Sequence, residues 1–302
     1  MGVLPGNKSN HSNFRKEIAM KTNRYFLNHF FFALSLVVLF SSSVQAETTE
    51  CTVITSLPYT ISTQGIYCLK GHLGTSMTSG NAIEINTNNV VIDLNGYKIG
   101  GLGAGPDTWA SGIYAYQRQN ITIRNGTVRG FFWGISLDSG DLTTSQGHLV
   151  EGIRADMNTF GGIGVVGRGN IIRNNQVVDT GGHSVGARGI QVYGSGNRVI
   201  NNNVYGTVGN PGLAGYDSIG ITLWYGQGSI VENNRVSNSI LSSDSCGVEV
   251  YDSANVLAIN NGVTNMDYGI VYSGSSTGKY RDNVTSGVTT PYTGGTDAGG
   301  NN

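Results

Sequence analysis

The chain repeats a short alternation of apolar and other residues that begins each time at a glycine. Ile or Val directly follows Gly112, Gly134, Gly162, Gly189, Gly220, Gly247 and Gly269, and Ala82-Ile83 matches the pattern once more upstream. Successive glycines of this set lie 22 to 31 residues apart. After Gly220, Ile221 and Leu223 alternate with Thr222 and Trp224, which predicts a strand with one apolar face. A repeat of this length with strand periodicity indicates a solenoid.

Each repeat contains two further short strands and a sharp bend between them. Asn recurs at this bend in one column of Asn95, Asn125, Asn174, Asn201, Asn233 and Asn260, and in a partner column of Asn175, Asn202, Asn234 and Asn261. Asn tolerates left-handed backbone angles, and stacked amides can bond one another from coil to coil. We therefore assign the Asn columns a structural role. Glu151 interrupts the first column.

The Gly-Ile/Val strands, the Asn-Asn bends and the Gly-rich chain, with 46 glycines, resemble the right-handed parallel β-helix proteins of the pectin-lyase-like superfamily. The resemblance extends from Ser79 to about Gly287. It implies an all-β fold, a right-handed parallel β-helix of about eight coils with an N-terminal cap. Right-handed winding is also what parallel crossover connections favour. The superfamily holds lyases, hydrolases, epimerases and non-enzymatic surface proteins, so the fold leaves the function open.

The two ends of the chain differ from the repeat. Residues 1–46 have basic residues, an apolar run over Phe30–Phe40 and small residues before Ala46, which is the pattern of a secretory signal peptide, with Met20 as a possible true start. The apolar run is too short for a membrane span. We therefore expect a secreted or periplasmic protein with no membrane span after cleavage. Its remaining parts are an N-terminal cap (47–79), the β-helix (80–287) and a polar C-terminal tail (288–302).

The net charge of the chain narrows its possible partners. The formal net charge is −1, and removal of five basic residues and Glu17 with residues 1–46 leaves −5. A mildly acidic surface argues against nucleic acid and anionic membranes as partners.

The three cysteines are expected to play two different roles. Secretion makes a Cys51–Cys68 disulfide the expected pairing, and it should stabilise the fold by about 3 kcal/mol in the chain-entropy picture. Cys246 is expected to be a buried free thiol.

The repeat also sorts the first-strand side chains into inner and outer ones. If the apolar residue after each glycine points inward, the residues two and four positions after the glycine point outward. The first outward column is then Glu84, Tyr114, Ser136, Gly164, Gln191, Thr222, Glu249 and Val271. The second is Asn86, Tyr116, Asp138, Val166, Tyr193, Trp224, Tyr251 and Ser273.

Three aromatic residues of the second column, Tyr193, Trp224 and Tyr251, fall in consecutive coils about 4.8 Å apart. Such a row suits the apolar faces of sugar rings, and Tyr116, Gln191 and Glu249 add polar groups on the same face. Asp138, in the same column as Tyr116, is a further candidate binding residue. The alternative is that the rings only stack on one another and shield the sheet. The expected partner is a polysaccharide or a cell-surface glycan bound by a monomer.

The two outward columns also indicate whether the chain has the side chains that an enzyme acting on polysaccharide needs. A glycosidase needs two carboxylates about 5 to 9.5 Å apart, and no adjacent coils supply such a pair in either column. A uronic-acid lyase needs a cation for the sugar carboxylate and a base, for which Arg188, Asp217 and Glu249 are the candidate set. No acidic cluster predicts a metal site, and Ca²⁺ enters only through the resemblance.

The sequence therefore predicts a secreted β-helix protein that binds polysaccharide along an exposed aromatic face, with catalysis left open. One alternative is a uronic-acid polysaccharide lyase of the pectate-lyase-like type, which acts by β-elimination. A second alternative is a non-catalytic surface or adhesion module.

Overall fold

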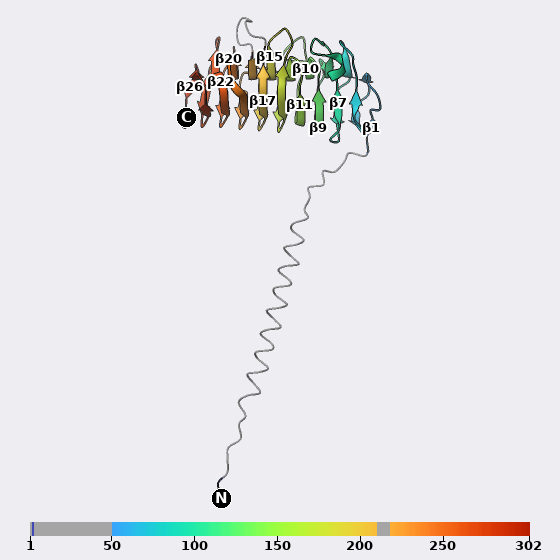
Figure 1. The fold of residues 1–302 in the computed structure, drawn as a ribbon, viewed down its shortest axis with the longest axis horizontal. Coiled ribbons are helices and arrows are strands. Elements are labelled where there is room, and N and C mark those ends of the chain that lie inside the picture. The colour runs from blue at the N-terminus through green and yellow to red at the C-terminus, as the bar shows by residue number, and fades with distance from the viewer. Residues whose placement is uncertain (1, 3–49, 210–217) are drawn as a thin grey trace. The chain divides into compact units, whose positions relative to one another are not determined.

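The computed structural model describes residue 2, residues 50–209 and residues 218–302. The chain divides into Met1–Glu47 and Thr48–Asn302, and the second unit holds all described strands. Those 26 strands pair in parallel throughout, and the described residues include one short 3₁₀ helix, η1 (Leu102–Ala104). The expected signal peptide, apart from Gly2, lies outside the described residues. Figure 1 shows the coils of the second unit stacked in chain order.

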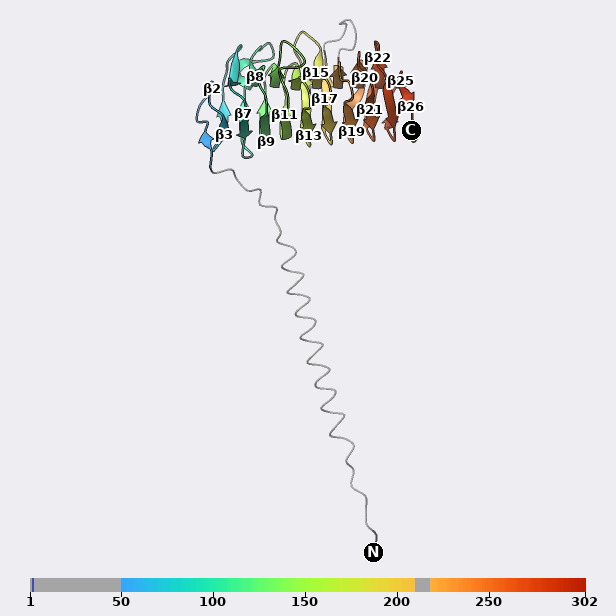
Figure 2. The same ribbon diagram turned by 180° about the vertical axis from the view of Figure 1, so that it is seen from behind.

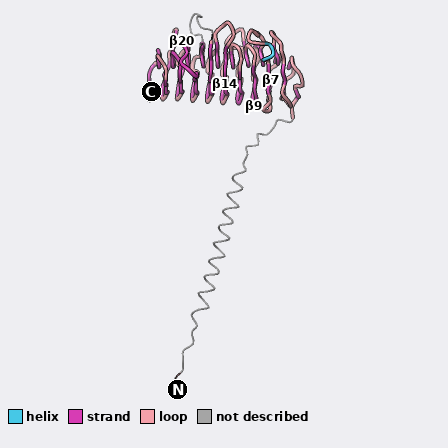
Figure 3. The backbone as a smooth tube through the Cα atoms, viewed as in Figure 1, coloured by secondary structure: helices cyan, strands magenta, loops and turns pink. Residues whose placement is uncertain are grey.

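The strands form three rows, one for each side of the coil (Figures 2 and 3). The first row is β2 (Tyr59–Ile61), β5 (Asn81–Ile85), β8 (Ser111–Tyr116), β10 (Trp133–Asp138), β12 (Gly161–Val166), β15 (Ala187–Tyr193), β18 (Ser218–Trp224), the end of β20 (Arg235–Tyr251), the end of β22 (Gly262–Ser273) and β25 (Thr290–Thr293).

The second row is β1 (Thr52–Val53), β3 (Gly65–Cys68), β6 (Val90–Asp93), the start of β9 (Ile121–Arg129), the start of β11 (Leu149–Asp156), β13 (Ile171–Arg173), β16 (Arg198–Ile200), β19 (Ile230–Glu232), β21 (Val256–Ile259), β23 (Gly278–Arg281) and β26 (Thr296–Asp297). The third row is β4 (Leu73–Gly74), β7 (Lys98–Gly100), the ends of β9 and β11, β14 (Gln176–Gly181), β17 (Asn203–Val208), the starts of β20 and β22, and β24 (Val284–Ser286). The predicted parallel β-helix is confirmed.

The residue after each repeat glycine points into the core, as predicted. Ile113 pairs with Ile135 in the neighbouring strand, and both are fully buried. Burial of each such side chain stabilises the fold by about 1.5–3 kcal/mol. The glycine itself is required by close packing, because a Cβ at Gly189 would lie 2.6 Å from Cγ1 of Val204 on the third row. Each repeat glycine therefore lies where its first-row strand packs closely on the third row.

The two Asn columns have different structural roles. The first column has positive φ at every predicted position, from 49° at Asn95 to 59° at Asn125. The partner column is buried and hydrogen-bonded from coil to coil: Oδ1 of Asn202 accepts from the backbone N–H of Asn175 at 3.0 Å. The Nδ2 of Asn202 in turn donates to the carbonyl of Ile172 at 2.9 Å. The structural role predicted for the Asn residues is therefore correct.

The residues around Glu151 explain why it interrupts the first Asn column. The left-handed position of its coil is taken by Gly152, with φ 61°, which needs no side chain to tolerate that angle. Glu151 stands one residue earlier, in register with Arg124 and Arg173. Its carboxylate forms an ion pair with Arg173 at 2.7 Å on the outside of the second row.

Strand stacking continues past the boundaries expected for the cap and the tail. Cys51 and Cys68 form a disulfide beside β1 and β3, and β3 pairs in register with β6. At the other end, β25 pairs with β22 and β26 pairs with β23, although both lie after residue 287. The coils therefore begin within residues 47–79 and extend into residues 288–302.

Candidate functional site

The outer face of the first row carries the two predicted columns in register. Ser136 pairs with Gly164, and Gly164 pairs with Gln191, as the first column requires. In the second column Tyr193 pairs with Trp224. These residues therefore lie side by side on consecutive strands of one face.

The same face has a third column, which simple alternation does not predict. It consists of the residue directly before each glycine, such as Trp133 before Gly134. The indole of Trp133 lies over the next coil, where a Cβ added at Gly164 would be 2.9 Å from its Cζ3 atom. Strict alternation would place Trp133 inside with Ile135. Gly134 and Ile135 are both buried, so the alternation is interrupted at the glycine and the side chain before it points outward.

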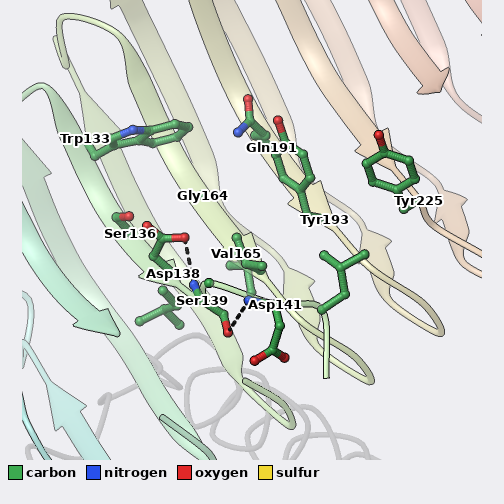
Figure 4. A pocket seen from close by; sticks show the side chains of 14 residues that line it. Trp133, Ser136, Asp138, Ser139, Asp141, Gly164, Val165, Gln191, Tyr193 and Tyr225 are labelled. Carbon is green, nitrogen blue, oxygen red and sulfur yellow. Dashed lines mark hydrogen bonds between the residues drawn. The ribbon is translucent and has the colours of Figure 1, made fainter. Parts of the chain in front are cut away.

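A cavity of about 390 Å³ opens on this face over β10, β12 and β15. It is lined by Trp133, Ser136, Leu137, Asp138, Ser139, Gly140, Asp141, Leu142, Gly164, Val165, Val166, Gln191, Tyr193 and Tyr225. Figure 4 shows Trp133 on one side, Gln191 and the rings of Tyr193 and Tyr225 on the other, and Gly164 between them. The cavity exists because Gly164 has no side chain where the neighbouring coils have Ser136 and Gln191.

The wall of the cavity is a loop between β10 and β11, and Asp141 holds its shape. The Asp141 Oδ1 atom accepts hydrogen bonds from the backbone N–H groups of Thr143 and Thr144, each at 2.7 Å. Oδ2 accepts from the Thr144 hydroxyl at 2.7 Å. These bonds, led by those from Thr144, hold the pKa of Asp141 well below its usual range. The carboxylate therefore stays ionised at any physiological pH.

Asp138 contributes a second carboxylate to the lining. Its Oδ1 accepts from the backbone N–H of Ser139 at 2.7 Å. Burial raises the pKa of Tyr114, and the charge of Asp138 raises it further. Burial likewise raises the pKa of Tyr193; Arg188 opposes this, and Asp138 adds to it. Both phenols therefore keep their protons at neutral pH and can donate hydrogen bonds.

The predicted aromatic row forms, and its rings contact one another. The ring centroids of Tyr193 and Trp224 are 5.2 Å apart, and those of Trp224 and Tyr251 are 4.9 Å apart. Oε2 of Glu249 accepts from the Trp224 indole N–H at 3.2 Å and from the Thr222 hydroxyl at 2.9 Å. Tyr193 alone of the three lines the cavity. The row is thus a fixed aromatic strip that leads away from the cavity.

The candidate catalytic residues are not gathered at the cavity. Glu249 is 6% exposed and is engaged with Trp224 and Thr222. Arg188 donates from Nη1 to the carbonyl of Ala187 at 2.9 Å, and neither it nor Glu249 lines the cavity. Asp217 lies outside the described residues. A joint catalytic role for the three stays a prediction.

Tyr225 lines the cavity, whereas Tyr116 does not line it and lies behind the wall loop. Tyr116 pairs in register with Asp138, and its hydroxyl faces Gly140 of the wall loop, where an added Cβ would lie 2.5 Å away. Tyr225 adopts φ 53°, an uncommon backbone angle for a bulky residue, directly after β18. This angle directs a 40% exposed ring to the cavity edge. Sequence periodicity misses Tyr225 because it belongs to a turn.

A second aromatic cluster adjoins Trp133. The Phe160 ring meets Trp133 edge-on at 5.1 Å and stacks on Phe132 at 4.7 Å. Phe132 contacts Trp109 at 4.6 Å, and Trp109 is 57% exposed. Buried His183 meets the Trp109 ring edge-on at 4.6 Å. Ring contacts thus connect the cavity wall with an exposed indole.

The described residues contain neither a cluster of acidic, His and Cys side chains nor a membrane-spanning helix. In residues 50–209 and 218–302, no three His, Cys, Asp or Glu side chains gather closely enough to hold a metal ion. A role for Ca²⁺, which the resemblance suggests, stays a prediction. Within those ranges no helix has the length and apolar character needed to cross a membrane.

Comparison with known proteins places the chain by its fold. No curated protein matches the sequence significantly. Among solved structures, the enzymatically active domain of tailspike protein 2 from bacteriophage CBA120 matches with a TM-score of 0.58 at 16% identity, over 79% of this chain and 38% of that one. The Dettilon tailspike protein matches with a TM-score of 0.52 at 15% identity, over 83% of this chain and 59% of that one. The chain thus spans less than two thirds of either tailspike.

At these identities the likeness shows the fold alone. The sequence profile described as "right handed beta helix region" matches residues 37–285, which is most of the chain. This match indicates the same fold as the three rows of parallel strands and the buried Ile/Val column. The chain belongs to the right-handed β-helix family.

Proposed function

We propose that the protein binds a polysaccharide in the cavity between Trp133 and Tyr193, on the outer face of the first strand row. The observation that carries this proposal is the composition of the cavity: an indole forms part of one side, and hydroxyl, amide and carboxylate groups line the rest. The volume of about 390 Å³ lies in the range of small-ligand sites.

The lining matches the chemistry of a sugar ring. A pyranose has apolar C–H faces, which pack on aromatic rings, and hydroxyl groups at its edge, which both donate and accept hydrogen bonds. Trp133 offers the ring. Ser136 and Gln191 can donate and accept, Asp138 accepts, and the protonated Tyr193 phenol donates. The rings of Trp133 and Tyr193 are also packed against Phe160 and Trp224 before binding, which lowers the entropic cost of association.

A polymer rather than a single sugar fits the surroundings of the cavity. The strip Tyr193–Trp224–Tyr251 leads away on one side, and the contacts from Trp133 through Phe132 to Trp109 lead away on the other. All these residues come from one chain, so a monomer suffices. The Cys51–Cys68 disulfide supports an oxidising compartment, either extracellular or periplasmic.

The lyase alternative is less well supported by the geometry. β-Elimination on a uronic acid needs a cation for the sugar carboxylate as well as a base, and the cavity lining includes no Lys or Arg. Arg188 and Glu249 do not line the cavity. A surface or adhesion module that binds glycan without catalysis would use the same cavity. The proposed polysaccharide binding therefore includes this second alternative.

The test is a binding survey by affinity electrophoresis in gels that contain different polysaccharides. We expect at least one polymer to retard the protein and Trp133→Ala to abolish the retardation. Tyr205→Ala is the matched control, because Tyr205 is an aromatic residue that is 39% exposed on β17 in the third row. Retardation that survives Trp133→Ala, or that Tyr205→Ala removes equally, would contradict the assigned site. Unsaturated chain ends, detected by ultraviolet absorbance, would instead support the lyase.

A further inference from the structure

Given the proposed function, the charges at the cavity determine which class of polysaccharide it accepts. Two lining residues, Asp138 and Asp141, carry carboxylates, and the lining includes no Lys or Arg. Neither aspartate takes part in an ion pair of the described residues. The electrostatic potential at the cavity is therefore set by acceptor groups with a negative charge.

Both charges are built into the site. Asp141 receives its hydrogen bonds from Thr143 and Thr144, which are neutral donors, so its negative charge is oriented but not cancelled. Asp138 is half-buried and accepts from the backbone N–H of Ser139. Further along the face, the buried carboxylate of Glu249 adds negative charge and Arg188 adds one positive charge beyond the cavity lining.

The remaining polar groups favour neutral hydroxyls as partners. Ser136 and Gln191 can each donate and accept, which suits sugar hydroxyls. A sugar carboxylate only accepts, and it is best bound by Arg or by several N–H donors. The cavity presents it with Asp138 and Asp141 instead. At about 6 Å in a water-like dielectric, repulsion weakens binding about threefold for each aspartate, or about tenfold for the two together.

We propose that the cavity selects an uncharged polysaccharide and discriminates against uronic-acid polymers. This inference rests on the proposed function, since it specifies the ligand of the same site. It also separates this chain from the uronate-lyase alternative, because a lyase site must attract the carboxylate that this cavity repels.

The test uses pairs of polymers that differ only in charge. Each neutral glucan, mannan or galactan of a panel is compared with its own C6-carboxylated form, and dissociation constants are measured by calorimetry at low and high salt. We expect the neutral member to bind about tenfold more tightly at low salt. The ratio should shrink at high salt because ions screen the exposed charges.

Asp138→Asn should reduce the preference for the neutral over the carboxylated form about threefold, because both forms lose the same hydrogen-bond acceptor and only the carboxylated form gains from the removed charge. Glu232→Gln is the matched control, because it removes a carboxylate from β19 in the second row. Equal or tighter binding of the carboxylated member at low salt would overturn the selectivity while leaving polysaccharide binding intact. Failure of every polymer of both series to bind would overturn the proposed function itself.

Discussion

At the scale of single residues, the buried His148 makes the stability of the folded protein depend on pH. Its side chain is 2% exposed, and Nδ1 accepts from the backbone N–H of Ile121 at 3.2 Å. Nε2 therefore carries the proton and donates to the Ser145 hydroxyl at 2.7 Å. Burial lowers the pKa of His148 from 6.5 to about 4. The folded protein thus keeps this imidazole neutral.

This shift predicts a loss of stability in mild acid. Above pH 6.5 the ring is neutral in both states, and between pH 6.5 and 4 the unfolded chain binds a proton that the folded state does not. The free energy of unfolding should therefore fall by about 3 kcal/mol as pH drops through this window. His148→Asn should remove that part of the fall, measured by urea unfolding at several pH values. Parallel pH curves for the two proteins would contradict this.

The choice of asparagine as the replacement for His148 follows from the neighbouring coils. Oδ1 of Asn170 accepts from the N–H of His148 at 2.9 Å, and Oδ1 of Asn197 accepts from the N–H of Asn170 at 2.8 Å. In His148→Asn, the new amide oxygen can accept from the N–H of Ile121 in the same way. The variant thus keeps an acceptor at this place in the coil and removes the titratable ring.

Gly164 sets the depth of the cavity. A Cβ there would lie 2.9 Å from the Trp133 ring, closer than carbon atoms normally approach. Gly164→Ala should displace the indole and weaken polysaccharide binding at least about tenfold, as measured by calorimetry. Gly71→Ala is the control, since a Cβ at Gly71 meets nothing within 4 Å. Unchanged affinity in Gly164→Ala would show that the sugar does not enter over this glycine.

At the scale of elements, the buried Asn ladder joins the coils at one corner. Asn202 accepts from Asn175 and donates to the Asn234 Oδ1 at 3.0 Å and to the Ile172 carbonyl at 2.9 Å. Asn202→Ala would leave buried groups of these neighbours without partners, at about 1–3 kcal/mol each. We expect a loss of about 3 kcal/mol or more in urea unfolding. Exposed Asn203 is the control; an equal effect of Asn203→Ala would argue against the ladder.

The sequence predicts these elements well because each coil repeats the same physical demands. Apolar side chains after the glycines fill the core, and Asn takes the left-handed bends, so both features recur at fixed places in the repeat. Trp133 and Tyr225 were not predicted as site residues. Trp133 points outward because two successive buried residues, Gly134 and Ile135, interrupt the alternation, and Tyr225 lies in a left-handed turn. The wall loop at Asp141 depends on side chain to backbone bonds that leave no periodic signal.

At the scale of the whole molecule, each coil contacts only its neighbours, so the ends are held on one side alone. The disulfide joins Cys51 to Cys68 across 17 positions at the N-terminal end and should stabilise it by about 3 kcal/mol. Reduction should accelerate hydrogen exchange in β1–β4 while β17 and β18 exchange as before. Uniform acceleration along the chain would show that the coils unfold together.

The fold and the function are determined by different parts of the chain. The repeat specifies the coil many times over, whereas the cavity depends on one glycine, one indole and one loop that occur once. A shared β-helix therefore does not transfer an activity. The proposed site contains Asp138 and Asp141, whereas Arg188 and Glu249 of the predicted lyase set do not line it.

The most direct test of the account is a crystal structure of the protein with a neutral oligosaccharide bound. We predict a pyranose face against Trp133 at about 4 Å, above Gly164, with its hydroxyls bonded to Gln191 and Asp138. Sugar bound on the second or third strand row, with the face of Trp133 left uncovered, would contradict it.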